Sequence, residues 1–262
     1  MSTTNLVPME AEPAIPPPSY TDAMAVTTAF RHLDRGGRQF PRKFSISPNT
    51  VGSSDEWVLG EVQHQPLYAI GRREQPSGNK PDLVLHDGTS LNSPTFASFR
   101  SLPGSPRTWK VRLPPSDAES EAGFELVSWG SDWRAQKRPL LMFSVETDVC
   151  GQREEFEWRS SNNGNIRALL GGQSLGWKLV RITQDAFSDQ LPGPRGAWPR
   201  TSKGAEIIAV FSSCGPDLGF DWRFAFLGTG VKDVLGSKWQ TMSVITSLIL
   251  MDMILRMNSE AA

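Results

Sequence analysis

The residues most often used in catalysis and metal binding are few and scattered in this sequence. The 262 residues include only 3 His and 2 Cys. His32, His64 and His86 do not have the spacing of a metal-binding motif, and Cys150 and Cys214 form no CxxC pair. We therefore predict a non-catalytic protein without a metal or cofactor. A hydrolase that uses Cys150 or Cys214 as its nucleophile is the enzymatic alternative.

Two glycine-rich stretches are also poor candidates for phosphate binding. Residues 171–176 follow one predicted strand and lead into another, whereas a phosphate loop must open a helix. Gly228-Thr229-Gly230 does precede an apolar C-terminal segment, but it lacks the rest of the fingerprint. The sequence has no GxSxG motif either.

The most specific binding motif lies near the N-terminus, where Pro17-Pro18-Ser19-Tyr20 forms a PPxY sequence. Such motifs are ligands of WW domains, because the prolines hold a polyproline II ribbon against aromatic side chains. Tyr20 would fill a neighbouring groove. We predict a WW-domain partner that binds Pro17, Pro18 and Tyr20, and a ubiquitin ligase with WW domains is the natural candidate. Chance is the alternative, since Pro-rich tails produce such tetrapeptides fairly often.

Basic residues gather in two segments, although the whole chain is not basic. Lys+Arg 27 against Asp+Glu 28 gives a net charge of −1, which argues against a dedicated nucleic-acid binder. A tryptophan between cations suits a membrane interface, so we predict that these segments contact anionic phospholipid or phosphoinositide headgroups. An ordinary solvated polar surface is the alternative. The candidates are Arg31, Arg35, Arg38, Arg42 and Lys43 in the first segment, and Arg195, Trp198, Arg200 and Lys203 in the second.

Short runs of alternating apolar and polar residues must position these groups. In the clearest run, residues 220–226, four aromatic side chains recur at every second position, as expected for a half-buried strand. Asn163-Gly164 between the runs 155–159 and 166–170 predicts a tight hairpin of those two strands. About a dozen strands with short connections indicate an antiparallel all-β fold. The predicted strands are 40–46, 57–62, 67–72, 83–86, 95–100, 109–113, 124–129, 140–145, 155–159, 166–170, 177–182, 206–211 and 220–226.

One long apolar segment, residues 239–257, follows the last strand. Ser237 and Gln240 have the spacing of a capping box, so we predict that Ser237 caps a helix. Its residues are apolar on nearly every face, which is typical of a helix buried in protein or in a membrane. The segment is short of the roughly 20 apolar residues of a membrane span. It also contains Asp252, which can pair with Arg256 one turn on, so we predict a buried helix; a membrane anchor is the alternative.

The N-terminal residues set the domain boundary and the compartment. Residues 1–27 are rich in Pro, Ser and Thr without helical or strand period, so we expect a disordered tail followed by one domain over residues 28–258. Glu10 and Glu12 interrupt any signal-peptide core, and the two cysteines form no disulfide framework. Both observations predict a cytoplasmic protein.

Together these segments resemble the superfamily that joins tubby C-terminal domains, plant LURP-one-related proteins and phospholipid scramblases, and they look most like its uncharacterised fungal members. The resemblance is carried by Phe156-Glu157-Trp158-Arg159, residues 176–181, residues 224–228 and the apolar segment 239–256. It implies a closed antiparallel barrel of about twelve strands around a buried hydrophobic C-terminal helix.

This sequence also departs from the superfamily in the residues that carry function. The acidic calcium-binding stretch of the scramblases is missing, since residues 218–236 offer only Asp221 and Asp233. The tubby signature that holds phosphoinositide-binding lysines is missing as well. We therefore expect a non-catalytic binding or adaptor module that docks on anionic membrane lipid. A tail-anchored or peripheral membrane protein of scramblase type is the alternative.

Overall fold

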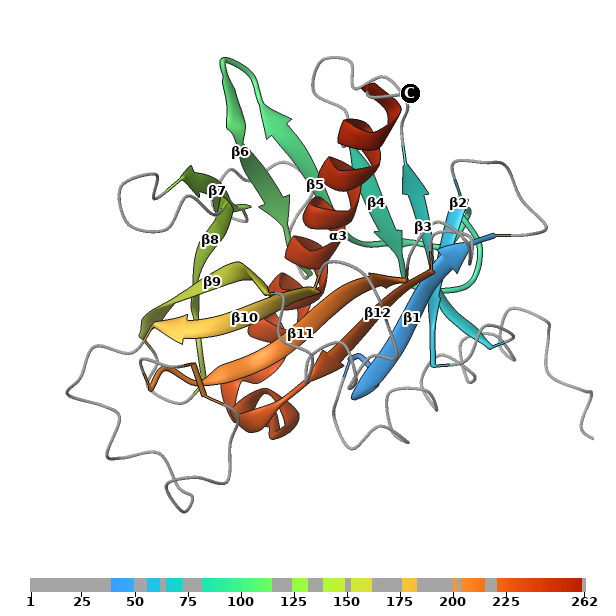
Figure 1. The fold of residues 1–262 in the computed structure, drawn as a ribbon. Helices are drawn as coiled ribbons and strands as arrows, with labels where there is room; N and C mark the ends of the chain where they lie inside the picture. The colour runs from blue at the N-terminus through green and yellow to red at the C-terminus, as the bar shows by residue number, and fades with distance from the viewer. Residues whose placement is uncertain are drawn as a thin grey trace, which may run out of the picture.

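Twelve strands form one closed antiparallel barrel in the computed structural model (Figure 1). The structure describes residues 39–49, 56–61, 65–72, 82–114, 124–131, 139–148, 152–161, 176–182, 200–201, 204–214 and 221–260. Each strand pairs with its neighbours in sequence, and β1 closes the barrel against β12. The strands are β1 (Lys43–Pro48), β2 (Glu56–Gly60), β3 (Pro66–Arg72), β4 (Leu83–His86), β5 (Thr95–Leu102), β6 (Ser105–Arg112), β7 (Phe124–Ser131), β8 (Pro139–Glu146), β9 (Arg153–Ser161), β10 (Gly176–Ile182), β11 (Ile207–Cys214) and β12 (Asp221–Phe226).

A long helix, α3 (Gly236–Glu260), runs through the barrel. Two short 3₁₀ turns, η4 (Gly228–Val231) and η5 (Asp233–Leu235), lead from β12 into it. By length and composition, residues Gly236–Ser259 could cross a membrane, but 72% of the apolar 18-residue window within them is buried. The predicted fold, a twelve-stranded barrel around a buried C-terminal helix, is therefore confirmed.

Aromatic side chains line the barrel where the period-two pattern places them. Trp222, Phe224 and Phe226 on β12 are all buried, and Phe224 stacks on Phe44 of β1 with ring centroids 4.7 Å apart. The ring of Trp222 stacks in the same way on that of Phe211, at 5.3 Å. Phe44 and Phe224 are directly opposite each other on β1 and β12. Phe211 is opposite Phe224 and therefore diagonal to Trp222, and diagonal neighbours on one face of a sheet are still within reach of aromatic side chains.

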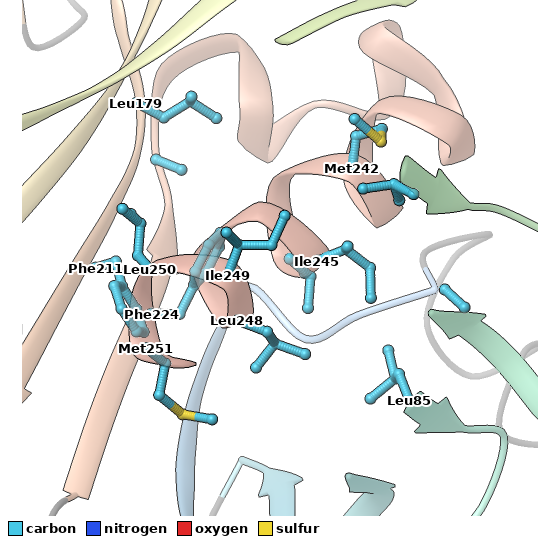
Figure 2. Packing of buried hydrophobic residues seen from close by; sticks show 14 of the residues in the cluster. Leu85, Leu179, Phe211, Phe224, Met242, Ile245, Leu248, Ile249, Leu250 and Met251 are labelled. Atoms are coloured by element: carbon cyan, nitrogen blue, oxygen red, sulfur yellow. The ribbon is translucent and has the colours of Figure 1, made fainter. Parts of the chain in front are cut away.

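The helix supplies aliphatic side chains to the same core. Ile245, Leu248, Ile249 and Leu250 are fully buried, and Figure 2 shows them between Phe211 and Phe224 on one side and Leu85 on the other. An apolar surface on every face of a helix is stable in water only when it is covered all round. The closed barrel provides that cover.

Polar side chains in the buried part of α3 make hydrogen bonds within the helix or to the barrel wall. The hydroxyl groups of Ser243 and Thr246 donate to the carbonyls of Trp239 and Met242, at 2.9 and 2.7 Å. The indole Nε1 of Trp158 on β9 donates to Thr246 Oγ1 at 2.8 Å. These bonds offset the cost of placing polar atoms in an apolar core, about 1–3 kcal/mol for each unpaired group.

The helix begins two residues earlier than the capping box predicts, because a cap at Ser237 would make Lys238 the first helical residue. α3 starts at Gly236, so Ser237 lies in its first turn. Gly236 has φ +84°, a conformation that favours glycine, and a Cβ there would lie 2.5 Å from the carboxylate of Asp148. A carboxylate beside the start of a helix is favourable, because the free N–H groups there carry partial positive charge.

The prediction that strand 155–159 pairs with strand 166–170 across Asn163-Gly164 was wrong. Both edges of β9 are occupied, with Phe156 paired to Phe143 of β8 on one side and to Arg181 of β10 on the other. Residues 162–175 lie outside the described part of the chain. A turn signal is local, whereas the closure of the barrel decides which strands are neighbours.

Replacing Leu248 with alanine tests the buried position of the helix. Removing a large side chain from a packed core costs about 2–5 kcal/mol. We expect L248A to lower the free energy of unfolding in urea by that amount. Met257 on the same helix is 54% exposed, so M257A should change it by less than about 0.5 kcal/mol. Equal losses in the two variants would contradict this packing.

Candidate functional site

Three of the predicted lipid-binding residues lie in the described part of the chain. Arg42 and Lys43 are exposed at the start of β1, and Arg200 is exposed just before β11. The WW-binding residues Pro17, Pro18 and Tyr20 lie outside the described residues. So do the remaining lipid candidates, Arg31, Arg35, Arg38, Arg195, Trp198 and Lys203.

The barrel brings Arg42, Lys43 and Arg200 to one end, although they are far apart in sequence. The carbonyl of Arg42 accepts a hydrogen bond from the N–H of Phe226, at the end of β12. On the other side of β12, the N–H of Leu227 donates to Ile208 of β11, and Arg200 forms a bridge with Glu206 just before that strand. We call this end, where α3 also begins, the lower rim. In the barrel, β12 lies between β1 and β11.

Arg200 has a structural role at the rim. Its Nη1 donates to the carbonyl of Gly204 at 2.7 Å, and the N–H of Thr201 donates to the carbonyl of Ala205 at 2.8 Å. Gly204 has φ +85° in this turn. The guanidinium of Arg200 is therefore partly committed to holding the turn, whereas Lys43 has no such role among the contacts that the structure describes.

Glu206 binds the glycine-rich turn that resembles part of a phosphate loop. Its carboxylate accepts a hydrogen bond from the N–H of Thr229 at 2.8 Å and another from its hydroxyl at 3.1 Å. Gly228 has φ +54°, and a Cβ there would lie 2.5 Å from Glu206 Oε1. The two glycines around Thr229 are therefore explained by close packing, and the anion that this turn binds is a side chain of the same protein.

A second acidic residue, Glu125 on β7, fixes the start of the helix. Its carboxylate lies 2.8 Å from Nζ of Lys238 in the first turn of α3 and also pairs with the guanidinium of Arg153 on β9. Burial by itself would raise the pKa of Glu125, but the hydrogen bonds from Arg153 and Lys238 outweigh it and lower the pKa. The hydrogen bond between Arg153 and Glu125 also raises the pKa of Arg153.

Acidic and basic side chains therefore alternate along the lower rim. Arg181 and Glu154 form a further ion pair there, with Arg181 almost fully buried, and Glu154 also accepts a hydrogen bond from Thr147 at 2.6 Å. The rim has no continuous basic surface among the described residues. Arg42, Lys43 and Arg200 are exposed there without an acidic partner that the structure describes, and of these three the Arg200 guanidinium is bound to the carbonyl of Gly204.

The opposite end of the helix confirms one predicted contact and adds another. Nε of Arg256 lies 2.7 Å from Asp252 Oδ2, as the i, i+4 spacing predicts. Nε of Arg72 on β3 lies 2.7 Å from Asp252 Oδ1, a contact between residues 180 positions apart. We call this end the upper rim. No local pattern could have indicated Arg72, because its partner is set by the closure of the barrel.

The acidic residues that precede the helix do not gather. Asp221 begins β12 and Asp233 begins η5. Burial raises the pKa of Asp221, which weakens it as a cation ligand, while the charge of Arg223 opposes that shift. Among the described residues, no group of three or more His, Cys, Asp or Glu side chains could hold a metal ion. Cys150 and the side chain of Cys214 lie outside the description.

Comparison of the chain with protein-family models, with curated proteins and with solved structures found no match in any of the three. The superfamily resemblance thus stays a prediction.

Replacing Glu125 with glutamine tests the ion pairs at the lower rim. A lowered pKa means that the carboxylate stabilises the fold above its ordinary pKa, and that this stability is lost as pH falls through the lowered pKa. We expect E125Q to be less stable than the native protein at neutral pH in urea denaturation. The gap should close in acid, where both proteins carry a neutral side chain. The exposed Glu155, replaced by glutamine, should show little change; a gap that persists in acid would contradict the mechanism.

Proposed function

We propose that the protein is a non-catalytic cytoplasmic adaptor whose barrel is a scaffold, with partners bound on its outer surface and by its N-terminal tail. The observation that carries this proposal is the position of α3: the helix and the inward-facing aromatic side chains occupy the barrel interior. Partners therefore have to be recognised outside the barrel. The superfamily resemblance supports the same conclusion, since it implies this architecture and not a shared catalytic site.

Two chemistries on this adaptor follow from the sequence motifs. The PPxY sequence at Pro17-Pro18-Ser19-Tyr20 recruits a WW-domain protein. The exposed cations Arg42 and Lys43, at the start of β1, contact anionic headgroups when the protein is peripheral to a membrane. Gln39 lies beside Thr241 near the start of α3, so the tail joins the barrel at the lower rim. Arg42 and Lys43 lie at the same rim.

A peptide of residues 10–26 should bind WW domains through its PPxY sequence. We expect saturable binding to members of a WW-domain panel by fluorescence anisotropy, and loss of that binding when Tyr20 is replaced by alanine, because the aromatic ring fills a groove on the domain. The control is the same peptide with Ser19→Ala, which alters the position that the motif leaves open. No binding to any domain of the panel would overturn this part of the proposal.

Reversing the charge of Lys43 should weaken membrane binding. A basic residue near an anionic surface contributes about 1 kcal/mol, so Lys43→Glu should cost about 2 kcal/mol of binding free energy. The measurement is flotation with phosphatidylcholine vesicles, with and without phosphatidylserine or phosphoinositide, at low salt. Arg107→Glu makes the same charge change at another exposed position, on β6, and should have a smaller effect. If the native protein does not float with any vesicle, lipid binding is excluded.

A further inference from the structure

We propose that Lys43 is the acceptor of ubiquitin from a ligase that binds the PPxY tail. This inference rests on the proposed recruitment of a WW-domain ligase. In the transfer, the Lys43 amine attacks the thioester that joins the C-terminus of ubiquitin to a cysteine of the ligase. A C–N bond forms, the C–S bond breaks, the amine loses a proton, and the ligase thiol is released. The reaction requires a lysine that is exposed and close to the point where the ligase is held.

Lys43 is exposed on the outer surface of the barrel. It is the first residue of β1, and its register partner on β12 is Ala225, which lies between the inward-facing Phe224 and Phe226. Side chains of directly paired residues point to the same face of a sheet, so the amine of Lys43 points away from the core.

Lys43 is also close to the root of the tail. The described chain begins at Gln39, whose carbonyl accepts a hydrogen bond from the Tyr68 hydroxyl at 2.5 Å. The hydroxyl of Thr241 in α3 lies 2.6 Å from Oε1 of the same glutamine. Gln39 is thus fixed to the lower rim, and the four residues to Lys43 span at most about 14 Å. Gln39 follows Tyr20 by 19 positions, a length of chain that can span at most about 65 Å, enough for a bound ligase to reach the rim.

Most other lysines of the described residues are less suited to the transfer. The amine of Lys238 lies 2.8 Å from the Glu125 carboxylate, and that of Lys110 lies over the ring of Phe124, 5.7 Å from its centroid. Lys178 is half-buried on β10. Lys232 is exposed after η4, which makes it a matched comparison for Lys43.

The test uses the full chain with activating and conjugating enzymes, ATP, ubiquitin and a WW-domain ligase that has a catalytic cysteine. The native protein, K43R, K232R and Y20A are compared, and the modified lysine is identified by mass spectrometry of tryptic peptides. Binding of each variant to the isolated WW domains is measured in parallel. Arginine keeps the positive charge at an exposed position, so neither lysine variant should disturb the fold. We expect the native protein and K232R to be modified at Lys43, and K43R to lose the main product.

The outcomes separate this inference from the function on which it rests. If the native protein neither binds the WW domains nor depends on Tyr20, the recruitment itself is wrong. If binding depends on Tyr20 but K43R is modified as much as the native protein, or no variant is modified, only the assignment of Lys43 is overturned.

Discussion

The structure depends on one constraint: a helix that is apolar on every face has to be shielded from water. Residues Val244, Ile245, Leu248, Ile249 and Leu250 are all fully buried, and no single layer of strands could cover them from every side. A sheet that closes on itself covers a central helix completely and leaves no open edge. The barrel and the helix therefore need each other, because without the helix the inward-facing aromatic rings would surround an empty lumen.

Burial by itself does not fix how far the helix extends through the barrel. That position is set by ion pairs at the two rims, Lys238 with Glu125 at the lower rim and Asp252 with Arg72 at the upper rim. The two helix residues are 14 positions apart, about 21 Å along the axis. A slip of the helix would separate both pairs. Glu125 would keep only Arg153 and Asp252 would keep only Arg256, so each partly buried carboxylate would lose one of its two cationic partners, which is destabilising.

The same architecture limits where function can reside. The interior is used for folding, and the glycine-rich turn before the helix is occupied by Glu206. The proposed binding residues therefore lie outside the barrel. Arg42 and Lys43 are at the lower rim, where Gln39 joins the N-terminal tail to the barrel. In the proposed adaptor the two tasks would be separate: the barrel holds Arg42 and Lys43 at fixed positions on its surface, and the tail would supply the recognition motif.

The sequence by itself determined the elements and the class of fold. The aromatic period of β12 and the all-round apolar character of α3 are local patterns, and both predicted the correct structure because side-chain periodicity reflects burial directly. The Asp252–Arg256 pair was predictable for the same reason, since its spacing is one helical turn. The tertiary structure alone decided the pairing of β9 with β10, the contact of Arg72 with Asp252, and the meeting of Glu206 with Thr229. These contacts join residues that are distant in sequence, and only the closure of the barrel determines which distant residues become neighbours.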